Sequence, residues 1–148
     1  MSPTPFALIA VFAAGAAAAL QGPTNARLAA GLGAPVNAAL VSFAVGTVTL
    51  AALALFMQQR TDAASVRDLP GWAWIGGLYG ALFVVVLAWA TPKLGVATSL
   101  AAVVAGQVVL GLAIDHFGLM GVPRQPVSLT RLGGAALVIG GMLLVRRG

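Results

Sequence analysis

Residues 5–31 read PFALIAVFAAGAAAALQGPTNARLAAG, an apolar run long enough to cross a membrane as one helix. A bilayer core of about 30 Å needs roughly 20 helical residues, because each residue adds about 1.5 Å. Four further apolar runs follow, at Pro35–Met57, Trp72–Thr91, Gly95–His116 and Leu129–Val145. The sequence therefore predicts an all-α integral membrane protein with about five transmembrane helices, which form a single transmembrane domain over residues 1–148.

The composition supports a membrane protein and argues against several other classes. Hydrophobic residues make up 60% of the chain and charged residues 7%, whereas a soluble surface needs roughly a quarter of charged residues. The net charge of +5 does not predict nucleic-acid binding, because the basic residues fall in loops and at helix ends. No catalytic constellation, phosphate loop or metal-ligand cluster is present, so we predict neither an enzyme nor a cofactor or metal site.

The basic residues give the chain almost no preferred orientation. With five spans the connections alternate between the two sides, and orientation normally follows an excess of Lys and Arg in cytoplasmic loops. Here four basic residues fall on each side: Arg60, Arg67, Arg124 and Arg131 against Arg27, Lys93, Arg146 and Arg147. We therefore predict insertion in both orientations and an antiparallel, dual-topology homodimer, with any polar pathway between the subunits because five short-looped helices enclose little volume.

The first apolar run is interrupted at Gly22 and Pro23. Proline removes a backbone donor and clashes with the preceding turn, so helix 1 is predicted to break near Pro23. Gln21 and Asn25 lie four residues apart and share one face. The segment is either an ordinary proline kink or a broken helix that presents polar groups to a ligand, as in many transporters.

Two polar residues of the fourth run complete a candidate substrate-binding set. Ser99 and Gln107 are eight residues apart, and we expect them to form one polar stripe, either as interhelical hydrogen bonds or as ligand contacts. The predicted substrate-binding residues are thus Gln21, Asn25, Ser99 and Gln107. Because Arg27 is the formal charge nearest to them, a neutral or anionic small solute is expected. Ser42, Gly46 and Thr47 in the second run are interpreted as helix packing.

Two further groups have structural interpretations. Asp115 is predicted to pair with Arg124 or Arg131 and to fasten the loop, in preference to a role in ion coupling. In the last run the pairs Gly133-Gly134 and Gly140-Gly141 are seven residues apart and lie on nearly one face. This flat groove packs either within the subunit or, as we predict, along the dimer seam.

The chain resembles the YdcZ-type family of small five-helix membrane proteins in the drug/metabolite transporter superfamily. The resemblance rests on residues 21–28, 41–43, 46–47, 106–107 and 131–133, and above all on Ile114-Asp115-His116-Phe117-Gly118 with the downstream Pro123-Arg124. It implies a half-sized transporter in the bacterial inner membrane, in a family where dual-topology homodimers and oppositely oriented pairs are expected. The superfamily's small multidrug exporters use an embedded glutamate, but this chain contains none.

Three classes of function follow from these features. The first is a small-molecule transporter built as an inverted pair, with a substrate site at the subunit interface. The second is a passive channel along the same polar midline. The third is a non-transporting accessory subunit, in which the polar residues only join helices. We predict the transporter.

Overall fold

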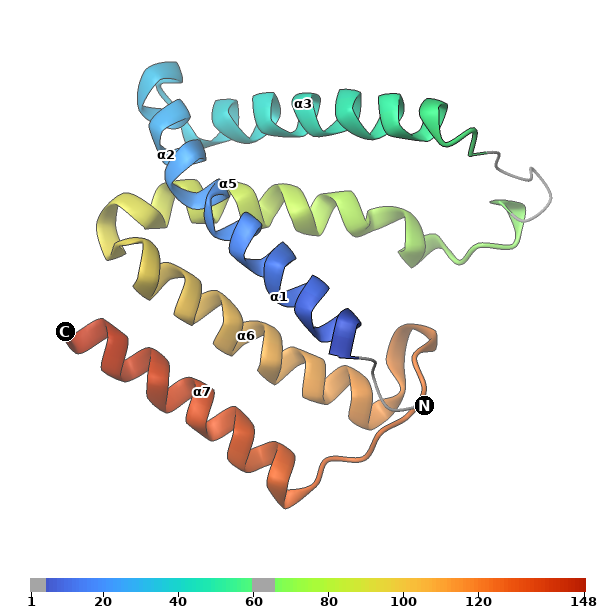
Figure 1. Ribbon diagram of the computed structural model, residues 1–148, viewed down its shortest axis with the longest axis vertical. Helices are drawn as coiled ribbons and strands as arrows, with labels where there is room; N and C mark the ends of the chain where they lie inside the picture. The colour runs from blue at the N-terminus through green and yellow to red at the C-terminus, as the bar shows by residue number, and fades with distance from the viewer. Residues whose placement is uncertain (1–4, 60–65) are drawn as a thin grey trace. The chain divides into compact units, whose positions relative to one another are not determined.

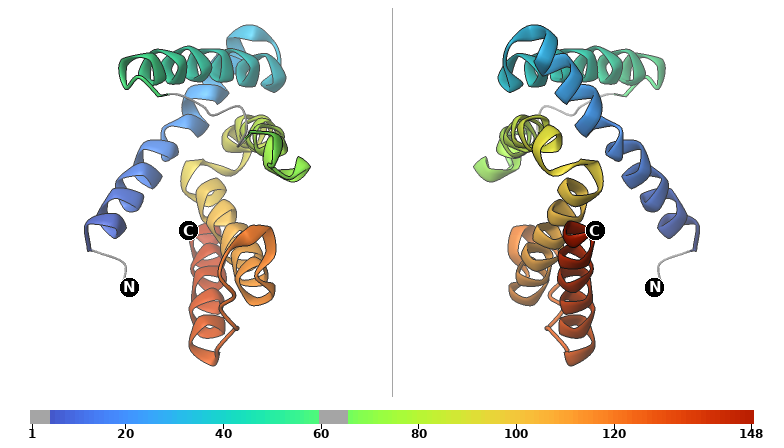
Figure 2. Two further views of the ribbon diagram at one scale, coloured as in Figure 1. Left: turned by 90° about the vertical axis from the view of Figure 1, so that its right-hand side faces the viewer. Right: turned by 90° about the vertical axis from the view of Figure 1, so that its left-hand side faces the viewer.

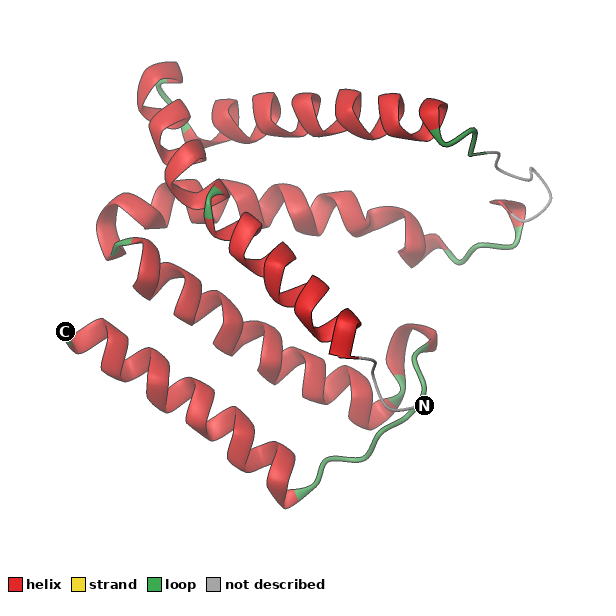
Figure 3. Ribbon diagram, in the orientation of Figure 1, coloured by secondary structure: helices red, strands yellow, loops and turns green. Residues whose placement is uncertain are grey.

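The computed structural model describes residues 5–59 and 66–148. This part of the chain contains helices and the loops that join them, with no strand (Figures 1 and 3). Five spans in this part of the chain are long and apolar enough to cross a membrane, which confirms the predicted fold class. The helices are α1 (Pro5–Ala19), α2 (Gln21–Leu32), α3 (Pro35–Phe56), η1 (Gly71–Ile75), α5 (Gly76–Leu94), α6 (Val96–Phe117), η2 (Leu119–Gly121) and α7 (Leu129–Arg147). Arg60 of the predicted charge balance lies outside the described residues.

The break in the first span lies at Leu20, three residues before Pro23, and the chain bends there in both side views of Figure 2. Pro23 has no N–H to donate to the carbonyl of Ala19, and its ring crowds that carbonyl. The regular pattern of backbone hydrogen bonds is therefore interrupted in the turn before Pro23. Across the break the backbone bonds are Leu20 N–H to Ala17 O at 3.1 Å and Thr24 N–H to Leu20 O at 3.2 Å. Pro23 itself sits in the first turn of α2, where its missing donor is tolerated.

Two predicted helix ends come more than one residue too early, because α7 continues past Val145 to Arg147 and α5 continues past Thr91. The third span was expected to stop at Thr91, but α5 continues through Pro92 to Leu94. Pro92 removes a single ladder bond, and the helix ends only where Gly95 takes a positive φ of 80°. A proline so close to the end of a helix therefore costs too little to set the boundary by itself.

Contacts group the chain into two compact units, Met1–Pro92 and Lys93–Gly148, and each is described by itself. The single domain inferred from the sequence stays a prediction. In the first unit α2 packs against α3 after a tight turn, in which Gly33 is left-handed and the Asn37 amide donates to Leu32 O at 2.9 Å. In the second unit α6 and α7 run side by side in opposite directions (Figure 1).

Small residues make the buried contacts. Among the described residues the buried apolar side chains are mostly alanines, namely Ala29, Ala38, Ala39, Ala88, Ala90, Ala105 and Ala135, with Val84 and Leu87. Large apolar side chains such as Phe12, Leu55 and Leu137 are exposed. This distribution is typical of helices in lipid, where large side chains face the bilayer and small ones allow close helix packing.

Gly22 of α2 faces side chains of α5 at short range. A Cβ at this position would lie 3.0 Å from Thr91 Oγ1 and 3.6 Å from Leu87 Cδ2, whereas a Cβ at Gly31 of the same helix would meet nothing within 4 Å.

We therefore predict that Gly22→Val destabilises the protein by about 1–3 kcal/mol, because the added methyl groups force α2 and α5 apart. Gly31→Val is the matched control and should leave stability nearly unchanged. Melting temperatures of the two variants in one detergent check this, and equal values would show that α2 and α5 do not pack at Gly22.

Candidate functional site

An open groove lies between α2, α3 and α5 in the first unit, with a volume of about 310 Å³. Its lining contains three polar side chains, two phenylalanines and no charged residue. The polar side chains are Gln21, Ser42 and Thr47, the aromatic rings are those of Phe43 and Phe83, and the remaining positions are Gly46, Leu50, Gly80 and Val84.

The groove lies at the middle of its three spans. Gly46 and Phe83 are at the centres of Pro35–Phe56 and Gly71–Leu94, and Gln21 is within three residues of the centre of Pro5–Leu32. Transporter sites typically lie near the bilayer midplane beside a discontinuous helix. The groove matches that description, because it lies at mid-span and beside the break between α1 and α2.

The hydroxyl groups in the groove are free to meet a ligand. Thr49 of α3 donates to Val45 O at 2.8 Å, so its hydroxyl is used within the helix. Ser42 and Thr47, which line the groove, have no side-chain hydrogen bond to any described residue. A buried or lipid-facing hydroxyl without a partner is costly, so these two groups favour a polar occupant.

The helix break adds backbone donors at the edge of the groove. No backbone bond joins the amides of Gln21 or Gly22 to α1 among the described residues. In a membrane, backbone groups released in this way must be satisfied by protein, by water or by a ligand.

Behind Gly22, α2 and α5 bury polar side chains. Asn25 is 3% exposed and Thr91 is 6% exposed, and Thr91 Oγ1 has no hydrogen-bond partner within the described chain. Asn25 therefore lies inside the packing of the first unit, while Gln21, one turn earlier, is exposed and lines the groove.

The single stripe expected for Ser99 and Gln107 does not form. Ser99 is 4% exposed and donates to Gly95 O of its own helix at 2.8 Å, whereas Gln107 is exposed. Eight residues correspond to about 2.2 turns, so the two side chains differ by roughly 80° in direction. Gln21 and Asn25 lie in the first unit and Ser99 and Gln107 in the second. The convergence of all four stays a prediction.

Arg27 lies on the opposite side of α2 from Asn25. It is exposed, and two residues of helix turn it by roughly 200° from the buried face that carries Asn25. Arg27 does not line the groove. The groove thus offers a neutral environment.

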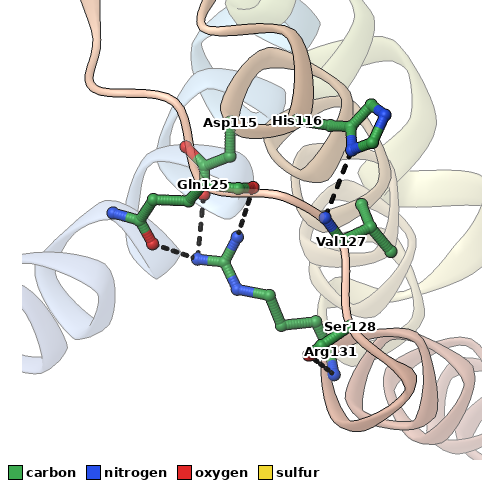
Figure 4. Close-up of polar contacts among 6 residues, drawn as sticks. All are labelled: Asp115, His116, Gln125, Val127, Ser128 and Arg131. Atoms are coloured by element: carbon green, nitrogen blue, oxygen red, sulfur yellow. Dashed lines mark hydrogen bonds and ion pairs between the residues drawn. The ribbon is translucent and has the colours of Figure 1, made fainter.

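The second unit contains a loop clamp, built from Asp115, Gln125 and Arg131 (Figure 4). The Arg131 guanidinium meets Asp115 Oδ2 at 3.1 Å and Gln125 Oε1 at 2.6 Å, and Gln125 N–H donates to Asp115 O at 2.7 Å. Of the two arginines expected near Asp115, Arg131 makes the ion pair, while Arg124 Nε donates to His116 O at 2.9 Å.

His116 and Gly118 hold the same loop through contacts outside the loop clamp. His116 Nδ1 accepts the Val127 N–H at 3.2 Å and so ties the end of α6 to the end of the loop (Figure 4). Gly118 ends α6 in the left-handed conformation with φ 64°, and a Cβ there would lie 3.3 Å from Arg124 Cβ. Asp115, His116 and Gly118 thus each help to close the loop, and the Phe117 ring packs edge-to-face against His116 with the ring centroids 4.8 Å apart.

The glycine pairs of α7 make no close contact with α6. Within the second unit the more buried positions of α7 are Arg131, Ala135, Val138, Gly140 and Met142, whereas Gly133, Gly134 and Gly141 are exposed. A Cβ added at Gly133, Gly134, Gly140 or Gly141 would meet no described atom within 4 Å. No side chain of the second unit therefore packs against these positions, while the dimer seam and its alternative, packing elsewhere within the subunit, both stay predictions.

The groove residues of α3 and α5 are not among the substrate-binding residues predicted from the sequence. Ser42, Gly46 and Thr47 were interpreted as packing, and Phe43 and Phe83 carried no signal in a chain rich in apolar residues. The available signal was the spacing of Ser42 and Gly46, four residues apart and therefore on one helix face at mid-span.

Comparison with known proteins agrees with a transporter. Residues 6–144 match the family described as "Putative inner membrane exporter, YdcZ". The chain is 32% identical over 111 residues to the "Inner membrane protein YdcZ" of Escherichia coli (strain K12), which covers 74% of each chain. No solved structure matches the chain. The chain belongs to this family of inner membrane exporters, and it is a multi-pass protein of the inner membrane.

We predict that Arg131→Lys loosens the loop clamp, because lysine keeps the charge but cannot hold two oxygens with a planar fork. The ion pair is about one-third exposed on each side, so the loss in stability should be at most about 1 kcal/mol. Amide exchange is the sharper measurement, since Gln125 N–H should lose protection. Arg146→Lys, at the other end of α7, is the control. Equal protection in both variants would refute the loop clamp.

Proposed function

We propose that this exporter works as an antiparallel, dual-topology homodimer and moves a small neutral or anionic solute through a site at the subunit interface. The observation that carries the proposal is the balance of four basic residues against four across five spans. A chain with so little orientation signal enters the membrane both ways. Two oppositely oriented copies then supply the inverted repeat that longer transporters encode in one chain.

The surface of α7 supports pairing with a second copy. Its glycine pairs make no close contact with α6 and form a flat strip on a helix whose neighbouring side chains are large. In lipid, such strips favour helix association through van der Waals contact. We place the dimer seam at Gly133, Gly134, Gly140 and Gly141.

Coupling to protons through a carboxylate at the membrane midplane does not fit this chain. Glutamate is absent, and the only carboxylate on a span, Asp115, lies near the end of α6 in its ion pair with Arg131. A proton pathway would normally be marked by a titratable group at membrane depth.

Flux measurements in reconstituted vesicles distinguish a carrier from a pore. We expect the flux to saturate with solute concentration, as it does for a carrier.

The first test concerns orientation. The chain has no cysteine, so single cysteines placed at either terminus report cleanly on sidedness. We expect each reporter to be labelled from both sides of the membrane in comparable amounts. Three lysines added after Gly148 should move most C-termini to the cytoplasm. A uniform orientation of the unaltered chain would contradict the homodimer.

The second test concerns the seam. Gly133→Leu or Gly140→Leu should weaken dimerisation by about tenfold or more, because bulky side chains separate the backbones and about 1.4 kcal/mol of contact is lost. Gly15→Leu on α1 is the control, since a Cβ there also meets nothing within 4 Å. Dimer fractions in vesicles, followed by energy transfer between labelled subunits, give the comparison. Equal affinities for all three variants would place the seam elsewhere.

A further inference from the structure

We propose that the groove between α2, α3 and α5 is the part of the solute site that each protomer supplies, and that it takes an uncharged solute with one aromatic ring and a hydrogen-bonding group. This inference rests on the transport function proposed above and narrows its substrate class. The proposed site residues are then Gln21, Ser42, Phe43, Thr47 and Phe83. Of the residues predicted from the sequence, only Gln21 belongs to this set.

The aromatic ring of the ligand follows from the walls of the groove. Phe43 on α3 and Phe83 on α5 both line it, and Gly46 and Gly80 leave space beside them. Planar groups gain from packing against phenylalanine rings, by about 0.5–1.5 kcal/mol beyond the area that they bury.

The absence of charge follows from the same lining. Neither Arg27 nor any other charged residue contributes to the groove, which lies at the middle of its spans. A charged solute would have to leave water without a counter-charge, which is far costlier than the transfer of a neutral group. Neutral molecules are therefore selected over both anions and cations of the same shape.

The hydrogen-bonding group follows from the free polar atoms. The Gln21 amide offers donors and an acceptor, and the hydroxyls of Ser42 and Thr47 are not used by their own helix. A volume of about 310 Å³ is at the small end of ligand pockets, so it fits one ring with a short polar substituent. A lipid acyl chain would leave all three polar side chains without partners.

Gly80 provides a way to fill the groove without removing any lining side chain. A Cβ at this position would lie 3.1 Å from Phe43 Cζ, so the methyl group of Gly80→Ala enters the groove and the ring of Phe43 must shift by a few tenths of an ångström. Gly76, one turn earlier on α5, has nothing within 4 Å of its added Cβ and supplies the matched control. Ser42→Ala is a second variant, and it removes one hydroxyl with little change in shape.

The test measures melting temperatures of the full chain in detergent, and then competition binding, with three matched sets of ligands. Each set has one ring and differs in charge: nicotinamide, nicotinate and 1-methylnicotinamide; benzamide, benzoate and benzylamine; and benzyl alcohol, phenylacetate and phenethylamine. We expect at least one neutral compound to raise the melting temperature, because a ligand that binds the folded state stabilises it. Its charged counterparts should bind at least about tenfold more weakly.

The variants should then separate the groove from other sites. Gly80→Ala should weaken binding of the neutral compound by about tenfold or more and Ser42→Ala by about fivefold, while Gly76→Ala binds as the unaltered protein does. The inference fails if no neutral compound binds, if the charged counterparts bind equally well, or if Gly80→Ala and Gly76→Ala behave alike. It also fails if mass spectrometry finds a tightly held lipid that Gly80→Ala releases. Orientation labelling is independent of these ligands, so the homodimer proposal can stand when the groove proposal falls.

Discussion

The fold of this chain depends on one missing hydrogen bond, between the carbonyl of Ala19 and the position occupied by Pro23. In water such a gap is filled by solvent, but at the middle of a bilayer the released groups need protein, trapped water or a ligand. The break leaves the amides of Gln21 and Gly22 without backbone partners in the described chain, and the side chain of Gln21 borders the groove. Gly22, beside the break, lets α2 approach α5 until its missing Cβ would touch Thr91. Pro23 and Gly22 thus act together. Pro23 interrupts the helix between α1 and α2, and Gly22 allows α5 to pack close to this interruption.

The sequence predicts the spans well because their length is set by the thickness of the bilayer and by little else. It predicts the helix break but shifts its position, since a proline disturbs the turn before it and not its own. The end of α5 was missed because Pro92 removes only one bond near a boundary that Gly95 sets. The single polar stripe predicted for Ser99 and Gln107 is wrong, because eight residues leave the two side chains roughly 80° apart around the helix. The groove could not be read from the sequence, because it depends on how α3 and α5 face each other, and apolar helices carry almost no pattern that records this.

The most distinctive motif of the chain contributes to structure in its described form. Asp115, His116 and Gly118 hold the connection between α6 and α7 through Gln125, Val127 and Arg124, and the Asp115 carboxylate is satisfied by Arg131. A loop closed in this way fixes where α7 begins and therefore which face α7 turns toward α6. In this arrangement a Cβ added at any of the four glycines of α7 would meet no described atom within 4 Å. This run of residues thus sets the course of the loop and the start of α7 through contacts within the second unit.

Depth also explains why the proposed solute site and the dual orientation are compatible. When a chain inserts both ways, a residue near a span end lies at opposite surfaces in the two copies, whereas a residue at mid-span keeps its depth. Asp115 and the paired arginine, near the ends of their helices, therefore move from one surface to the other on inversion. Gly46 and Phe83, at the centres of their spans, stay at the same level in both copies. Two such grooves can serve one solute at one depth, as alternating access requires. An uncharged lining has the further advantage that it favours neither insertion direction, so the proposed site does not disturb the balance of charge on which the proposed antiparallel pair rests.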